Sequence, residues 1–172
     1  VNNFILPSLR FDGVDDRLTF PNFSDLTNGV SLFVVFKPTS TSGDRTLITA
    51  SSASNADAFI AQTNNTNSTL TAYNNTTSSA LATSNNPISV DQYQLLEHVF
   101  QPGTTNGTAT ISVDGVQKAQ ATNLVSTLRN VTRSNNSIGM SSTSSEFFQG
   151  EVAEILFYNQ ILKPAQVASI RS

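Results

Sequence analysis

The chain has 172 residues, the size of one ordinary domain, so we expect a single domain over residues 1–172. Charged residues make up only 12%, the net charge is −3 and the basic residues are scattered, which excludes the clustered basic face of a nucleic-acid-binding protein. Without cysteine there is no disulfide scaffold, thiol nucleophile or Cys-type zinc site, and no run approaches the roughly 20 apolar residues that span a membrane.

Alternation of apolar and polar residues with period two dominates the chain and predicts short strands. The shorter candidates are Leu9–Asp12, Arg17–Phe20, Thr46–Ala50, Ala58–Gln62, Thr69–Tyr73, Ala80–Thr83, Gln94–Phe100 and Ser137–Met140. The stretch Asn64–Asn86 is almost entirely Asn, Thr, Ser and Ala, and its residual alternation predicts exposed strands at a sheet edge.

Longer segments predict the central strands, one hairpin and the helix. Val30–Phe36 and Val152–Tyr158 carry apolar residues on both faces, which predicts two central strands buried from both sides. Thr108–Asp114 alternates cleanly into Asp114-Gly115, a strong signal for a type I′ hairpin that returns through Val116–Ala121. Lys163–Arg171 is the one credible helix, with Pro164 in its first turn. We therefore expect an all-β fold, a two-sheet antiparallel jelly-roll sandwich with one short C-terminal helix.

Five segments, in order along almost the whole chain, resemble laminin-G-like domains of the concanavalin A-like lectin/glucanase superfamily. They are FDGVDDRL at residues 11–18, SLFVVFKP at 31–38, ISVDG at 111–115, SIG at 137–139, and FQGEVAEILFYN at 148–159 followed by ILKP. The resemblance implies the sandwich fold. Glu154 stands at an otherwise apolar place in the last strand, so we expect it to be buried and hydrogen-bonded to backbone amides, with a metal ligand as the alternative.

Catalysis is not expected. Glycoside hydrolysis on this fold needs two carboxylates at a defined separation, and the acidic motif of the glucanase branch is missing. Glu151 and Glu154 are three residues apart, which predicts opposite faces of a strand. His98 is the sole histidine, and no nucleophile-elbow motif accompanies it, so we interpret it as a packing residue.

Calcium is the one metal for which the sequence offers ligands. Asp12, Asp15 and Asp16 form the only acidic cluster, beside Gly13. Calcium takes six to eight oxygens, and in calcium-binding relatives an Asp in the closing strand completes the site, where this chain has Ala153. The alternative is that Asp12 caps a turn while Asp15 and Asp16 are solvated, so no cofactor is required.

Sugar binding normally uses an exposed aromatic side chain beside amides and carboxylates. With no Trp in the chain, the candidate ligand-binding residues are Tyr73, Asn74 and Phe147, and the alternative for the aromatic ones is packing at a sheet edge.

Two functions remain open. The first is a non-catalytic structural or adhesion module of a cell or virion surface, working through a protein partner or self-assembly. The second is a lectin-like module that recognises a surface glycan. Either places the chain outside the cell, at a cell surface or on a virion, with neither nucleic acid nor membrane insertion. Phe4, Ile5 and Leu6 are expected to bury themselves either against a partner or against their own sandwich.

Overall fold

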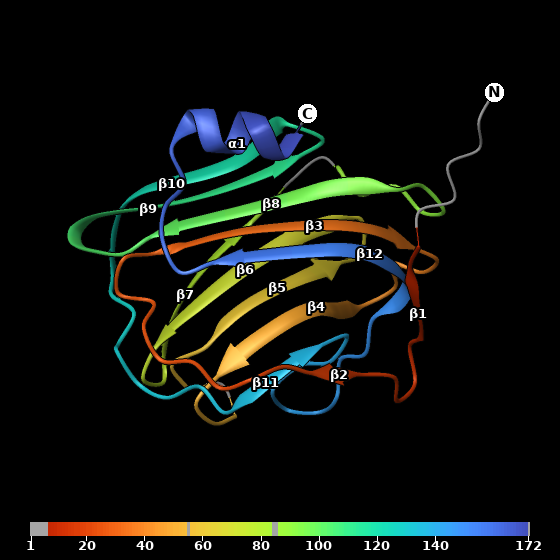
Figure 1. Cartoon of the computed structure of the whole chain (residues 1–172), viewed down its shortest axis with the longest axis horizontal. Helices are drawn as coiled ribbons and strands as arrows, with labels where there is room; N and C mark the ends of the chain where they lie inside the picture. The colour runs from red at the N-terminus through yellow and green to blue at the C-terminus, as the bar shows by residue number, and fades with distance from the viewer. Residues whose placement is uncertain (1–6, 55, 84–85, 172) are drawn as a thin grey trace.

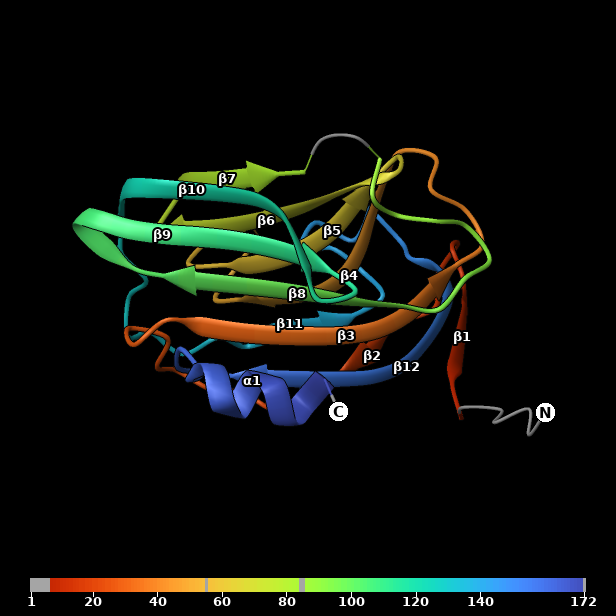
Figure 2. The same cartoon turned by 90° about the horizontal axis from the view of Figure 1, so that it is seen from above.

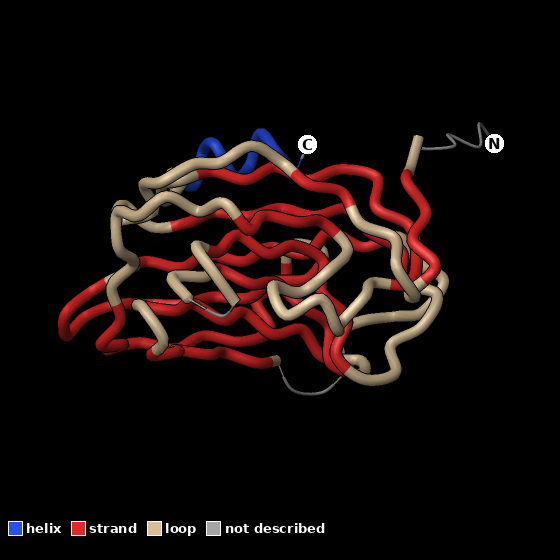
Figure 3. Tube along the Cα trace, turned by 90° about the horizontal axis from the view of Figure 1, so that it is seen from below, coloured by secondary structure: helices blue, strands red, loops and turns tan. Residues whose placement is uncertain are grey.

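A computed structural model describes residues 7–54, 56–83 and 86–171, which form a sandwich of two antiparallel sheets, A and B (Figure 1). In spatial order, sheet A consists of β1 (Leu9–Asp12), β12 (Gln149–Tyr158), β3 (Val30–Pro38), β8 (Gln94–Gln101), β9 (Gly103–Val113) and β10 (Val116–Ser126). Sheet B consists of β2 (Leu18–Thr19), β11 (Asn135–Ile138), β4 (Asp44–Ser51), β5 (Phe59–Asn64), β6 (Asn67–Asn74) and β7 (Thr77–Ala82). The segments expected from alternation thus all contribute strands, and Figure 3 shows how much of the trace they occupy.

The core lies between the sheets because alternate residues of each strand point inward. From β3 these are Leu32, Val34 and Phe36, all fully buried, and Phe59 and Leu70 face them from sheet B. The outward residues of β3 are covered as well, since helix α1 (Pro164–Arg171) lies over the outer face of sheet A (Figure 2). The prediction that Val30–Phe36 is central and buried from both sides is confirmed.

The turn between β9 and β10 and the first turn of α1 have the geometry that their sequences predict. Asp114 and Gly115 have φ of 51° and 74°, the two positive values that a type I′ turn requires. Pro164 opens α1, where its missing N–H costs nothing, and the Gln166 side chain accepts a hydrogen bond from the Lys163 amide at 2.9 Å.

A β-bulge in β12 makes two expectations about the closing strand wrong. The pairing with β3 shifts between Val152 and Glu154, so Val152 and Ile155, not Glu154, face the core. Glu154 is therefore exposed rather than buried, opposite Val35 on the outer face. Glu151 points outward too, toward Lys37, so the two glutamates share a face instead of lying on opposite ones.

The central position expected for Val152–Tyr158 holds only in part. β12 lies between β1 and β3, but β1 pairs with Gln149–Val152 alone. Residues 155–158 remain half-buried, in contrast to the inner positions of β3. The low-complexity stretch also differs from expectation, because only β7 is an edge strand while β6 lies inside sheet B.

His98 is a packing residue, as predicted. It is fully buried on the inner face of β8, where its Nε2 lies 2.8 Å from the Ser68 hydroxyl of β6. This contact joins the two sheets across the core. Burial disfavours the charged imidazolium and lowers the pKa of His98 to about 3.

Candidate functional site

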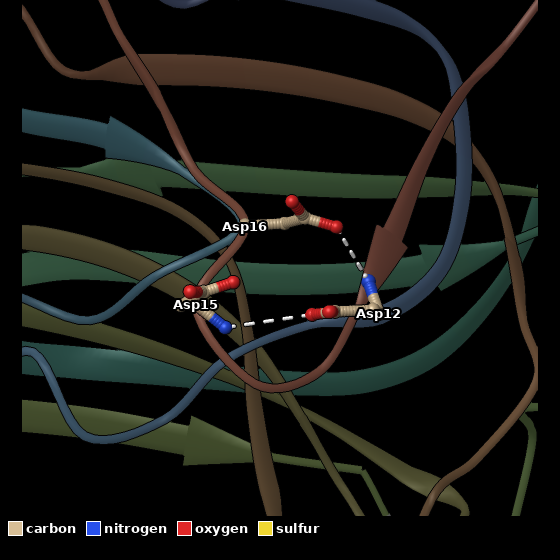
Figure 4. A group of neighbouring side chains, drawn as sticks. All are labelled: Asp12, Asp15 and Asp16. Carbon is tan, nitrogen blue, oxygen red and sulfur yellow. Dashed lines mark hydrogen bonds between the residues drawn. The ribbon is translucent and has the colours of Figure 1, made fainter.

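The acidic cluster lies in the loop that follows β1 (Figure 4). One carboxylate oxygen from each of Asp12, Asp15 and Asp16 lies within 4.8 Å of the others. Two of the carboxylates already bind the loop itself: Asp12 Oδ1 accepts from the Val14 amide at 2.8 Å, and Asp16 Oδ2 accepts from the Asp12 amide at 2.9 Å. Hydrogen bonds of this kind stabilise a turn without a ligand.

These three residues fit calcium poorly. Three carboxylates fall short of the six to eight oxygens that the ion takes, and Ala153 in β12 supplies no side-chain oxygen. The arrangement instead agrees with the alternative in which Asp12 caps the turn, so no function is derived from calcium.

The structure separates the sequence candidates for sugar binding. Phe147 bridges Thr46 near the start of β4, and its carbonyl accepts from Arg45 Nη1 at 3.0 Å. Asn74 ends β6, and the register of sheet B places it toward the opposite end from Thr46. Tyr73 precedes Asn74 and is half-buried. The three residues therefore do not form one site.

Asn74 does line a surface groove, which we name the end groove, of about 550 Å³. Its walls come from both sheets: Asn74, Asn75 and Thr77 from the β6–β7 hairpin, and Gly103, Thr104, Val125, Ser126, Thr127 and Arg129 from the start of β9 and the end of β10. These walls present amide, hydroxyl and guanidinium groups beside a larger share of apolar surface. Such groups pair well with the hydroxyls of a carbohydrate, which both donate and accept hydrogen bonds.

Asp57 binds two of the residues that line the end groove, Asn75 and Arg129. This carboxylate is 2% exposed and binds the Arg129 guanidinium at two points, Nε to Oδ1 at 2.7 Å and Nη2 to Oδ2 at 2.8 Å. Asp57 Oδ1 also accepts from the Asn75 backbone amide at 2.9 Å, and the Asp57 carbonyl accepts from Arg133 Nε at 2.8 Å. One buried residue thereby holds the β6–β7 turn and Arg129 in fixed positions.

The charges around Asp57 are compensated. Burial opposes the charged carboxylate, but the hydrogen bonds from Arg129 and the Asn75 amide outweigh it and hold the pKa of Asp57 below its ordinary value. Arg129 keeps 46% of its side chain exposed toward solvent, and only its Nε and Nη2 bind Asp57.

Backbone packing shapes the wall that β9 contributes. A Cβ at Gly103 would lie 2.4 Å from the Gly107 nitrogen, so only glycine permits the chain to close this tightly. The residues between them, including Thr104, are exposed beside the groove. Val125 is 77% exposed and supplies apolar surface among the polar groups.

Sequence reasoning found Asn74 but missed the rest of the end groove. Asp57, Thr104, Val125, Thr127 and Arg129 come from three separate stretches with no shared motif. The one local signal was Val125, an apolar residue at an outward position near the end of a strand.

Within the described ranges, no helix has the length and apolar character needed to cross a membrane. A search of curated protein sequences found no match to this chain.

Solved structures share the fold at low sequence identity. A native heptameric SAP-like pentraxin from Limulus polyphemus is 16% identical with a TM-score of 0.68, and the alignment covers 95% of this chain and 80% of that one. The CBM40 of a Ruminococcus gnavus IT-sialidase, bound to α2,3-sialyllactose, is 11% identical with a TM-score of 0.68, covering 96% and 98%. Tailspike protein 2 of the Escherichia coli O157:H7 bacteriophage CAB120 is 12% identical with a TM-score of 0.69, covering 95% and 24%.

The family model described as the concanavalin A-like lectin/glucanases superfamily, of laminin G type, matches residues 12–168. This range runs from the end of β1 into helix α1 and so includes almost all of both sheets. The chain belongs to the laminin G-like branch of the concanavalin A-like lectin/glucanases superfamily.

Proposed function

We propose that this domain is a non-catalytic, extracellular adhesion module that binds a surface glycan in the end groove. The observation that carries the proposal is the composition of the groove, where Asn75, Thr77, Thr104 and Arg129 present amide, hydroxyl and guanidinium groups to solvent around the exposed Val125. The CBM40 neighbour, whose structure holds sialyllactose, supports a carbohydrate as the ligand class on this fold.

The state of the acidic residues supports a non-catalytic role. Lys37 and Tyr93 hydrogen-bond the Glu151 carboxylate and lower its pKa to about 2, the opposite of what a general acid needs near neutral pH. Glu97 is buried in an ion pair with Arg171, and His98 is enclosed in the core. The side chains of Glu151, Glu97 and His98 thus all take part in structural contacts.

Weak monovalent binding is expected, because no aromatic side chain stands among the described residues that line the end groove. Sugar rings then lack a stacking surface larger than Val125. Adhesion modules compensate through multivalency, in which several linked copies raise the overall affinity by about 10²–10⁴-fold. The binding assay therefore has to present the domain in several copies.

The test is a glycan array probed with the domain displayed on a multivalent carrier. Val125→Asp, which places a charge in the groove, should abolish retention on the glycans that the unaltered domain binds. Val116→Asp is the matched control, because Val116 is also exposed and also on β10, at the far end of the strand.

Binding that is equal in both variants and the unaltered domain would place the glycan site elsewhere. Absence of binding to any glycan would favour the structural alternative, in which the sandwich contacts other proteins. Release of reducing sugar from a bound glycan would contradict the non-catalytic assignment.

A further inference from the structure

The end groove lies at one end of the sandwich, where the β6–β7 hairpin meets the start of β9 and the end of β10 (Figure 1). Among the described residues that line it, only Arg129 carries a charged side chain. The others have amide, hydroxyl or aliphatic side chains or are glycine. Whether the groove prefers charged or uncharged sugars therefore depends on how the charge of Arg129 is used.

The charge of Arg129 is matched inside the protein. Its Nε and Nη2 donate to the two carboxylate oxygens of Asp57 at 2.7 and 2.8 Å, a bidentate pair of the strong kind. Burial opposes the charged form of Asp57, but the hydrogen bonds from Arg129 and the Asn75 amide keep its pKa below the ordinary value. The carboxylate is therefore ionised at neutral pH, and the pair presents no net charge to the groove.

The neighbouring arginine, Arg133, is compensated as well. It is fully buried, and its Nε and Nη1 donate to the Asp57 and Ser24 carbonyls at 2.8 and 2.5 Å. Its positive charge and the Asp25 carboxylate attract each other. The two guanidinium groups of this cluster, Arg129 and Arg133, are thus balanced by two carboxylates.

No charged side chain is missing from this balance. Residues 1–6, 55, 84–85 and 172 lie outside the described ranges, and with them the apolar run at 4–6 that is expected to pack against a partner or against the sandwich. None of these residues is Asp, Glu, Lys, Arg or His. The whole chain has a net charge of −3, which repels an approaching anion.

We propose that the end groove selects uncharged oligosaccharides and discriminates against sugars that carry a carboxylate or a sulfate. The inference rests on the proposed function and names the class of glycan that the groove takes. The balanced charge of Arg129 and Asp57 is the observation that carries it.

An acidic sugar would have to compete with Asp57 for Arg129. If the guanidinium turned to the sugar, the Asp57 carboxylate, which is 2% exposed, would stay buried without its partner, and such an unpaired charge is strongly destabilising. If the anion bound beside the intact pair, it would lose part of its hydration without gaining a net attraction. By either route the acidic sugar binds more weakly than its uncharged counterpart.

An uncharged sugar avoids both costs and meets a groove whose walls are already held together. The Asn74 side-chain amide donates to the Thr127 hydroxyl across the groove, and Asp57 binds both Asn75 and Arg129. Walls that are fixed in this way reduce the entropy that binding costs. The exposed Val125 offers apolar surface to the C–H groups of a sugar ring.

The test compares matched glycans on one array. The domain on its multivalent carrier is applied to neutral oligosaccharides and to their sialylated and sulfated counterparts, with lactose and sialyllactose as one such pair. The array is read at about 0.1 M and at about 1 M sodium chloride, where the screening length falls from about 10 Å to about 3 Å. We expect the neutral member of each retained pair to bind about tenfold better or more, with little change between the two salt concentrations.

A charge variant probes the same site in the opposite direction. Val125→Lys adds a cation to the groove that no carboxylate of the cluster matches, so it should shift the preference toward acidic glycans and make retention fall as salt is raised. Val116→Lys, at the far end of β10, is the matched control and should leave the preference unchanged. Both valines are exposed, so both variants should unfold at nearly the temperature of the natural chain.

The outcomes separate this inference from the proposed function. Equal or stronger retention on the acidic glycans, lost in Val125→Asp, would overturn the inference and leave the glycan site in the end groove. A Val125→Lys variant with an unchanged preference would also overturn it. Retention that persists in Val125→Asp, or no retention on any glycan, would contradict the proposed function itself, and the inference would fall with it.

Discussion

His98 shows how one enclosed side chain couples stability to pH. It bridges the sheets through Ser68, and its Nδ1 has no hydrogen-bond partner among the residues that the structure describes. The neutral ring tolerates this position, but the imidazolium would bring a second N–H and a charge into the core without a partner. The pKa of about 3, lowered by burial, expresses that penalty.

The first prediction concerns this residue. The unfolded chain takes up a proton at His98 near pH 6.5, whereas the folded chain does so only near pH 3. The unfolded state therefore binds more protons in this window, and the free energy of unfolding should fall as the pH is lowered, by about 1.4 kcal/mol per unit. Urea titrations at pH 7, 6 and 5 measure it, and this range lies above the ordinary pKa values of the carboxylates.

The His98→Leu variant provides the control for that slope. It has no imidazole to protonate, so its free energy of unfolding should stay nearly level between pH 7 and 5 even if its overall stability differs. The same pH slope in the variant and in the natural chain would mean that other groups cause the acid sensitivity.

Helix α1 is an element held by its ends rather than by a buried face. None of its residues is buried, and its last turn is attached through Arg171, whose Nε and Nη2 bind the two Glu97 carboxylate oxygens at 2.9 and 2.6 Å. Glu97 is 3% exposed, so this ion pair places the helix over sheet A. Alternation and the proline signal predicted the helix and its sheet, but not the residue that joins them.

The second prediction follows from that pair. Arg171→Ala leaves the Glu97 carboxylate buried without its partner, which should lower the free energy of unfolding by about 1–3 kcal/mol. Peptides of α1 should then exchange hydrogen faster, because the remaining contacts of the helix are peripheral. Denaturant titration and hydrogen exchange measure the two effects.

A double variant separates the buried charge from the helix itself. Adding Glu97→Gln to Arg171→Ala removes the unpaired charge, so most of the lost stability should return while α1 still exchanges fast. If Arg171→Ala alone changes neither quantity, the ion pair is not what holds the helix.

At the scale of the whole molecule, the fold could be predicted because its strands and turns depend on local sequence patterns. The site could not be predicted because it depends on contacts between distant segments. The apolar run in Val30–Phe36 and the Asp114-Gly115 turn are local, so residues near one another in sequence determine them. Local patterns also mark where strands end, but not an irregularity inside one. The bulge after Val152 therefore reversed the orientation expected for Glu154.

The end groove depends on contacts between distant segments instead. Asp57 meets Arg129 across 72 residues and the Asn75 amide across 18, and no spacing rule connects them. Asn74 was found because amide groups beside an aromatic residue are a recognisable composition, whereas a buried aspartate in a Ser- and Ala-rich stretch carries no such signal.

Asp57 links three parts of the molecule, and its replacement is the last prediction. It lies between β4 and β5, binds the β6–β7 turn through Asn75, and binds Arg129 and Arg133 between β10 and β11. Asp57→Asn keeps the shape and tolerates the φ of 49°, but it cannot hold the guanidinium at both oxygens. The free energy of unfolding at pH 7 should fall by about 1–3 kcal/mol, and multivalent glycan retention should fall with it at temperatures where the variant is still folded.

The pH dependence of this effect has a definite sign. The folded pKa of Asp57 is lowered below 3.8, so its stabilisation is present above that value and is lost as the pH falls through the folded pKa. The difference in stability between Asp57→Asn and the natural chain should therefore shrink in denaturant titrations below pH 4. Asp91→Asn is the matched control, an exposed aspartate whose φ of 58° is also positive, and it should change neither stability nor glycan binding. A folded Asp57→Asn domain that binds glycans as well as the natural one would show that Asp57 supports the fold without shaping the groove.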